Sequence, residues 1–152
     1  MNRTTTISVT ADLLEIQPAW LENVMWIESR LRPDAVNPVS GATGLIQFMP
    51  ATAAALGTST EALKKMSFDE QMEFVYLYLR PWKGKMKSQV DVYLAVFFPA
   101  AIDKDDNYVL QTSKLSPALI AKQNPAYDLN KDQKVTKGEV AAAIERLLKK
   151  KR

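Results

Sequence analysis

The chain has 152 residues, of which 47% are hydrophobic and 24% are charged; its net charge is +3, and it contains no cysteine and no histidine. This is the composition of one folded domain of ordinary size. The missing residue types exclude disulfides, thiolate and ordinary zinc sites, cysteine nucleophiles and histidine-based triads, so a hydrolytic function would depend on carboxylates.

Helix signals dominate the chain, and no stretch alternates strictly between apolar and polar residues. The first strong helix begins at about Pro18 and must end before Pro33, and the next segment, residues 32–44, is a loop because it holds two prolines and two glycines. Caps and prolines bound the later helices, which are predicted at 50–56, 61–65, 68–80, 90–98, from Pro117, and at 137–150. The predicted fold is mostly α with at most a small β-hairpin.

Glu28 interrupts the apolar stripe of the first strong helix. Leu21, Val24 and Met25 occupy positions i, i+3 and i+4, and Glu28 stands at i+7, where another hydrophobic residue would be expected. Burial without a paired cation would raise the pKa of this carboxyl group and keep it protonated, as a glycosidic general acid requires. The alternative is a glutamate at the edge of the stripe that reaches water or pairs with Arg30 or Arg32.

The residues around Glu28 resemble a known signature. The run ESRLRPDAVNPVSGATGLIQFMPATAAALG, residues 28–57, is similar to the motifs of soluble lytic transglycosylases and goose-type lysozymes. The matching positions are Glu28, Ser29, Ala35, Gly41, Ala42, Gly44, Leu45, Gln47, Met49, Pro50, Thr52 and Ala53. The resemblance implies a lysozyme-like transglycosylase SLT domain that cleaves peptidoglycan without a catalytic cofactor. It assigns catalysis to Glu28 and glycan contact to Gln47, and Ser40 and Phe48 become cleft candidates by proximity.

A second motif of the family, Ala-Tyr-Asn-x-Gly, is incomplete in this sequence. The nearest segment, YLAVFFPAAI at residues 93–102, lacks the asparagine and the glycine. It resembles the variant of phage-encoded members, which implies an endolysin or a virion-associated lysin. Tyr93 is the substrate-binding candidate here, although Phe97 or neither residue could take the tyrosine's place, and plain core packing is the alternative for all of these aromatic residues.

A second catalytic carboxylate is not evident. Asp34 is the only other acid between Glu28 and Glu61, and beside Pro33 it is better explained as a turn former. The resemblance implies that one glutamate suffices for a lytic transglycosylase, which forms 1,6-anhydro-MurNAc, whereas a two-carboxylate hydrolase would need a second acid. A hydrolytic lysozyme, a non-catalytic wall-binding or tail module and a calcium-binding regulatory protein remain alternatives.

Residues 128–139, DLNKDQKVTKGE, have the donor spacing of an EF-hand calcium loop. Positions 1, 3, 5, 7, 9 and 12 of that loop are Asp128, Asn130, Asp132, Lys134, Thr136 and Glu139, with Lys134 contributing its carbonyl. Gln133 stands where the sharp turn calls for glycine, so we expect a lone, irregular and weak structural Ca²⁺ site. The alternative is a helix-capping turn without an ion.

The chain is expected to fold as one domain, in which a catalytic region, residues 1–110, packs with a C-terminal helical segment, residues 111–152. The last eight residues hold five basic groups and one acid, so the C-terminus is expected to be a solvated helix end or a weak contact to an anionic surface. No signal peptide is recognised, so we expect a protein of the host cytoplasm that is released to the cell wall, or a virion-associated protein. We also expect a monomer. Its expected partner is the peptidoglycan glycan strand, with no nucleic acid.

Overall fold

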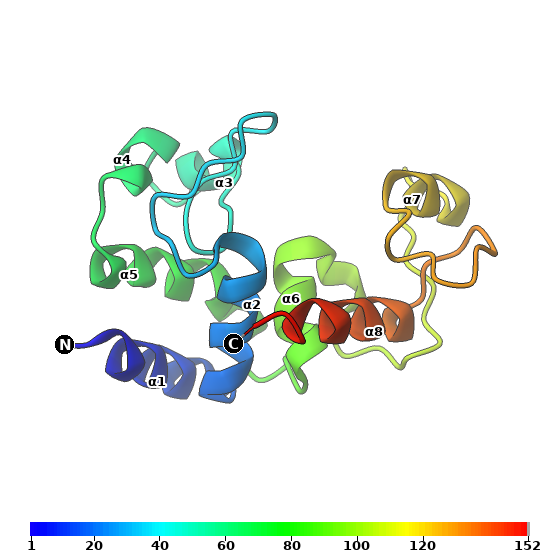
Figure 1. Ribbon diagram of the computed structural model, residues 1–152, viewed down its shortest axis with the longest axis horizontal. Helices are drawn as coiled ribbons and strands as arrows, with labels where there is room; N and C mark the ends of the chain where they lie inside the picture. Colours follow the sequence, from blue (N-terminus) through cyan, green and yellow to red (C-terminus); the bar gives the residue numbers. More distant parts are fainter. Residues whose placement is uncertain (152) are drawn as a thin grey trace. The chain divides into compact units, whose positions relative to one another are not determined.

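The computed structural model describes residues 1–151 and confirms the mostly α fold (Figure 1). The chain divides into two compact units, Met1–Gly84 and Lys85–Arg152. The α-helices of the first unit are α1 (Arg3–Leu14), α2 (Pro18–Ser29), α3 (Pro50–Ala55), α4 (Thr60–Lys64) and α5 (Phe68–Leu79). Those of the second unit are α6 (Gln89–Phe97), α7 (Pro117–Gln123) and α8 (Lys137–Leu148). Short 3-10 helices follow α5 at Arg80–Trp82 and α6 at Pro99–Ala101.

In the first unit α1 packs against both α2 and α5 (Figure 1). The side chain of Asn2 caps α1 by accepting a hydrogen bond from the Thr5 N–H at 2.8 Å. The predicted capping box of Ser67 and Glu70 begins α5. The largest fully buried apolar side chains of the unit are those of Leu14, Leu21, Met25, Leu45, Leu63, Met72 and Leu79.

The loop between α2 and α3 contains the only β-pairing in this unit, among the residues that the structure describes. Thr43 forms isolated antiparallel bridges with both Val36 and Phe48. The Gly44 N–H also donates to the Ala35 carbonyl at 2.8 Å. The loop is therefore folded back on itself and held by its own backbone, in agreement with the small hairpin that the sequence allows.

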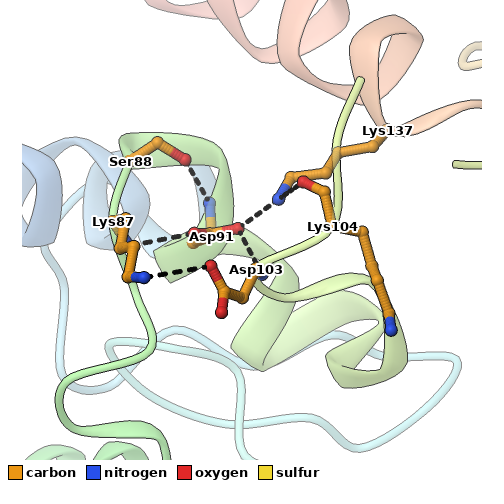
Figure 2. A network of polar contacts seen from close by, with 6 residues as sticks. All are labelled: Lys87, Ser88, Asp91, Asp103, Lys104 and Lys137. Carbon is orange, nitrogen blue, oxygen red and sulfur yellow. Dashed lines mark hydrogen bonds and ion pairs between the residues drawn. The ribbon is translucent and has the colours of Figure 1, made fainter. Parts of the chain in front are cut away.

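In the second unit α6 packs against α8 (Figure 1). A buried ion pair joins them, with the Lys137 Nζ 2.5 Å from the Asp91 Oδ1 (Figure 2). Asp91 is 2% exposed and Lys137 is 4% exposed. The same ammonium group donates to the Lys104 carbonyl at 2.7 Å, so it connects α6, α8 and the segment after α6.

The two units divide at Gly84, so residues 85–110, which the sequence predicts to be part of the catalytic region, lie in the same compact unit as the C-terminal segment. The Leu110 N–H donates to the Val135 carbonyl at 2.8 Å, and the Lys137 N–H donates to the Tyr108 carbonyl at 2.9 Å. Segment 108–110 therefore belongs to the same compact unit as the start of α8. Across residues 1–151 no helix combines the length and the apolarity that a membrane span requires.

Candidate active site

Glu28 lies in the last turn of α2, one residue before the helix ends. Arg30 and Leu31 adopt left-handed φ angles of 57° and 62°, and their N–H groups donate back to the carbonyls of Trp26 and Met25. The bond from Arg30 to Trp26, made by a residue in the left-handed conformation, is the αL type of C-terminal cap, which is more often made with glycine. The cap turns the chain sharply away and leaves Glu28 and Ser29 at the helix end.

The two arginines that could have neutralised Glu28 do not do so. The Arg30 guanidinium donates to the carbonyls of Trp26 and Ile27 and lies 4.0 Å from the centroid of the Trp26 indole. Arg32 is exposed, and neither arginine forms an ion pair with Glu28 within residues 1–151. The alternative of a paired surface glutamate is therefore not what the structure contains.

Burial raises the pKa of Glu28 to about 7, and burial is the only cause of that shift. Moving an ionised carboxylate away from water disfavours the charged form, and no cation of the described chain offsets this cost. Near neutral pH the group is divided between its acid and base forms. It can therefore donate a proton and afterwards accept one.

Tyr78 of α5 is a neighbour of Glu28 that the sequence did not single out. Burial raises the pKa of Tyr78, and the negative charge of Glu28 raises it further. Tyr78 does not shift the pKa of Glu28 in return, because the phenol is still neutral in the pH range where Glu28 loses its proton. The Tyr78 ring meets the Phe48 ring edge to face, with 6.3 Å between the ring centroids, and its centroid lies 5.5 Å from that of the Trp82 ring. Aromatic groups therefore surround this part of the site.

The loop after α2 is fixed to the site through Leu45. The Ser29 hydroxyl shares its hydrogen between the carbonyls of Met25 and Leu45, each at 2.9 Å. On the other side of this residue, the Leu45 N–H donates to the Gln71 Oε1 at 2.6 Å. Side chains from α2 and α5 thus hold both backbone groups of one loop residue.

Gln71, like Tyr78, is a candidate site residue that the sequence did not indicate. Its amide nitrogen donates to the carbonyls of Pro33 and Leu63 at 2.8 and 2.9 Å, so this fully buried side chain ties three segments together. A β-carbon at Gly44 would overlap the Gln71 amide, which explains why glycine stands there. The available signal was a glutamine beside the apolar stripe of α5, next to Met72.

The sequence-predicted cleft residues of the first unit occupy different environments. Gln47, at a φ of 57°, donates from its amide nitrogen to the carbonyls of Ala35 and Gly44 at 3.2 and 3.0 Å. Ser40 is exposed, and its hydroxyl accepts a hydrogen bond from the Ala42 N–H. Phe48 is 2% exposed and supports Tyr78. Their contact with glycan stays a prediction.

Tyr93 lies in the second unit, on α6. It is buried, its hydroxyl is hydrogen-bonded to that of Tyr127, and its ring lies 5.7 Å from the ring of Phe97. These contacts are those of an aromatic cluster, which is the alternative considered for it. A role in binding substrate stays a prediction.

No second carboxylate contributes to the pKa of Glu28. Asp34, the next acid after Glu28 along the chain, is exposed in the loop. The chemistry that this site offers is thus that of one acid–base group beside a phenol.

The predicted calcium ligands lie together in the second unit. One carboxylate oxygen from each of Asp128, Asp132 and Glu139 lies within 4.8 Å of the others. Asn130 donates to Asp132 at 3.3 Å, and Thr136 caps α8. The Lys134 N–H donates to Asp132 at 3.1 Å.

A protein-family comparison supports this assignment of the first unit. Residues 6–73 match the model of the family described as the transglycosylase SLT domain. The match includes Glu28, Gln47 and Gln71, and it confirms the resemblance found at residues 28–57. No curated protein matches the chain.

Proposed function

Because residues 6–73 of this chain match the model of the transglycosylase SLT domain, a family of peptidoglycan-cleaving enzymes, we propose that the protein cleaves the β-1,4 bond between MurNAc and GlcNAc with Glu28 as the sole acid and base. The observation that carries the proposal is the burial of Glu28, which gives this carboxyl group a pKa of about 7 without help from any other charge. Substrate identity and the sequence of proton transfers are carried over from the family, and the burial of Glu28 supports its assignment to both transfers.

The proposed reaction uses the two protonation states of Glu28 in turn. The protonated carboxyl donates its proton to the bridging oxygen as the bond from that oxygen to the MurNAc C1 breaks, and GlcNAc leaves with a free 4-hydroxyl. The resulting carboxylate then removes the proton from the MurNAc C6 hydroxyl, whose oxygen attacks C1 and closes the 1,6-anhydro ring. Glu28 ends protonated, so no water is consumed and the cycle can repeat.

The surroundings of Glu28 suit this single-carboxylate reaction. A hydrolase of the two-carboxylate type places a second acid about 5 to 9.5 Å from the first, across the scissile bond. The neighbour found here is Tyr78, whose raised pKa keeps it a neutral phenol. These features favour a transglycosylase over a hydrolytic lysozyme.

Gln47 is the residue that we assign to glycan binding. Its amide nitrogen is taken by two backbone carbonyls, so the amide group is held in one orientation. The amide oxygen makes no hydrogen bond within residues 1–151 and is able to accept one from a sugar hydroxyl or an N-acetyl group. A rigid acceptor of this kind would position the glycan strand for attack.

We further propose that the enzyme is a phage lysin, either an endolysin or a virion component, because residues 93–102 resemble the phage variant of the later family motif. Such an enzyme would act as a monomer on the glycan strands after release to the cell wall. The basic residues near the C-terminus would add a weak attraction to anionic wall polymer.

The test is digestion of purified peptidoglycan by the wild-type chain, with mass analysis of the products. Fragments ending in 1,6-anhydro-MurNAc, lighter by one water than reducing fragments, are expected. Reducing ends would instead identify a hydrolytic lysozyme, and intact sacculi would identify a non-catalytic module. Glu28→Gln should lose at least a hundredfold in rate, since general acid catalysis contributes about 10² to 10⁴. Glu73→Gln, an exposed glutamate on α5, is the matched control and should retain the rate.

A further inference from the structure

The segment from Asp128 to Glu139, between α7 and the first turn of α8, gathers negative charge that forms no ion pair with a cation of the described residues. The carboxylate oxygens of Asp128, Asp132 and Glu139 that lie within 4.8 Å of one another come from both ends and the middle of the loop. The ion pairs formed by residues 1–151 involve none of these three groups. Like charges at this spacing repel one another, so the loop would be stabilised by a bound cation.

Asp128 supplies the observation that points to a ligand. Its Oδ1 is buried, and among the described residues it is the only buried side-chain nitrogen or oxygen without a hydrogen-bond partner. Its other oxygen accepts a hydrogen bond from the Gln133 N–H at 3.1 Å. A buried carboxylate oxygen without a donor is costly, because it has lost its water and gained nothing in return. A metal ion at the centre of the cluster would complete its bonding.

The remaining donors of the loop are of the kind that hard cations prefer. Asn130 and Thr136 add an amide and a hydroxyl oxygen, and Lys134 adds a backbone carbonyl, at the intervals of an EF-hand. Gln133 adopts a φ of 67°, so the backbone makes the sharp turn of that loop although the residue is not glycine.

The loop is paired with another segment, and is not the lone hand expected from the sequence. Residues 108–110 run antiparallel to residues 135–137, with a bridge between Val109 and Thr136. The Gly138 N–H donates to the Asp106 carbonyl at 2.9 Å, and a β-carbon at Gly138 would lie 3.2 Å from that residue. Glycine therefore permits this close approach of the two segments.

The segment that pairs with the loop, residues 103–114, is called here the partner segment. It has the first donors of an EF-hand loop but lacks the last one. Residues 103–114, DKDDNYVLQTSK, place Asp103, Asp105 and Asn107 at positions 1, 3 and 5, whereas position 12 is Lys114. A lysine cannot replace the bidentate glutamate of a calcium loop. Within residues 1–151 the only converging group of three or more acidic side chains is the one in loop 128–139. The pair of segments therefore offers one complete site.

A buried contact connects this site to α6. Lys137 follows Thr136 directly, and its ammonium group reaches Asp91 on α6 and the Lys104 carbonyl (Figure 2). Asp91 also accepts a hydrogen bond from the Asp103 N–H at 3.2 Å. The end of the loop, the partner segment and α6 are thus tied to one another beside the acidic cluster.

We propose that residues 128–139 bind one Ca²⁺ per chain through Asp128, Asn130, Asp132, Glu139, the Lys134 carbonyl and Thr136, and that the ion holds the start of α8 against residues 108–110. The unfolded chain cannot assemble these ligands, so the ion stabilises the folded second unit. Calcium at a hundred times its dissociation constant should raise the ratio of folded to unfolded chain about a hundredfold. The non-glycine residue at position 6 suggests millimolar affinity.

The test is titration calorimetry and thermal melting of the full chain after treatment with a chelator, with CaCl₂ as the probe. MgCl₂ and NaCl at equal ionic strength control for a general salt effect. We expect one calcium per chain and a rise of the melting temperature that Mg²⁺ reproduces weakly or not at all. Neither measurement involves glycan cleavage, so the result is independent of the proposed enzymatic function.

Two isosteric variants, Asp128→Asn and Glu139→Gln, should lose the calcium response while keeping the helical circular dichroism of the wild type. The matched control is Asp105→Asn, which removes the same charge from an exposed position of the partner segment and should keep the response. The proposal is overturned if 10 mM CaCl₂ produces neither heat nor a change in melting temperature. A stoichiometry of two, or an unchanged response in both variants, overturns it equally.

Discussion

The hydroxyl of Ser29, the residue after Glu28, donates to the carbonyl of Leu45 at 2.9 Å. Gln71 accepts a hydrogen bond from the N–H of the same leucine. The loop that carries Gln47 is therefore fixed by Ser29 to α2, which carries Glu28, and by Gln71 to α5. The spacing of Glu28 from the Gln47 amide that we propose to bind glycan depends on both contacts.

Replacing Gln71 by leucine should destabilise the protein more than replacing Ser29 by alanine. Gln71→Leu leaves the Leu45 N–H and the carbonyls of Pro33 and Leu63 buried without their side-chain partner, each at a cost of about 1 to 3 kcal/mol. Ser29→Ala removes one hydroxyl, at a cost of about 1 kcal/mol. Urea unfolding gives the free energy of unfolding of both variants, and equal losses would contradict the larger role assigned to the three hydrogen bonds of Gln71. Gln123→Leu, at an exposed position of α7, is the control.

The pH dependence of stability should change when Glu28 is replaced by glutamine. The folded-state pKa of Glu28 is about 7, above its ordinary value of 4.5, so the folded protein holds this proton more tightly than the unfolded chain. Glu28 therefore contributes a loss of stability as the pH rises from about 4.5 to about 7, which amounts to about 3 kcal/mol at most. The variant should melt near the wild-type temperature at pH 4 and above it at pH 8.

Melting curves of both proteins between pH 4 and pH 8 test this expectation. A difference between the two melting temperatures that does not change with pH would show that Glu28 titrates normally. The same titration should appear in the rate of peptidoglycan cleavage, which is expected to fall as the pH rises above about 7, because the general acid loses its proton.

Most helix boundaries follow from local chemistry and could be predicted. The box of Ser67 and Glu70 begins α5, and Pro18 begins α2, as caps and prolines require. Helix α1 could not be predicted, because its run of threonines has weak helix propensity and its apolar residues form no clear stripe. It forms where it packs against α2 and α5, so tertiary contacts override local preference.

The candidate site was predictable only where one element carries the signal. Glu28 could be found because a single helix places it on its own apolar face. Tyr78 is brought to Glu28 by α5, and Gln71 of the same helix is brought to the backbone of Leu45. The pairing of Leu110 with Val135 likewise joins segments that are distant in sequence. Periodicity and motif spacing report neighbours along the chain, so contacts of this kind emerge only from the folded structure.

The buried ion pair of Asp91 and Lys137 should be costly to break from one side (Figure 2). Lys137→Met leaves a buried carboxylate without its cation, and a loss of about 3 to 5 kcal/mol is expected. Adding Asp91→Leu should recover part of it, because the double variant has no isolated charge. Lys87→Met is the control, since the pair of Lys87 and Asp103 is exposed and should contribute less than about 1 kcal/mol. Additive losses in urea unfolding would show that the buried charges are not coupled.

Gln47 should distinguish backbone strain from glycan binding when it is replaced by alanine and by glycine. At a φ of 57°, alanine keeps the strain and loses the bonds to Ala35 and Gly44, whereas glycine loses the same bonds without the strain. Gln47→Gly should therefore be more stable than Gln47→Ala by up to about 1 kcal/mol. If the amide binds glycan, both variants should show the same reduction in cleavage rate on intact sacculi, because both lack the acceptor. If instead the cleavage rate of Gln47→Gly is close to that of the wild type and only Gln47→Ala is slow, the rate follows stability. Gln47 would then determine the conformation of the loop without binding glycan.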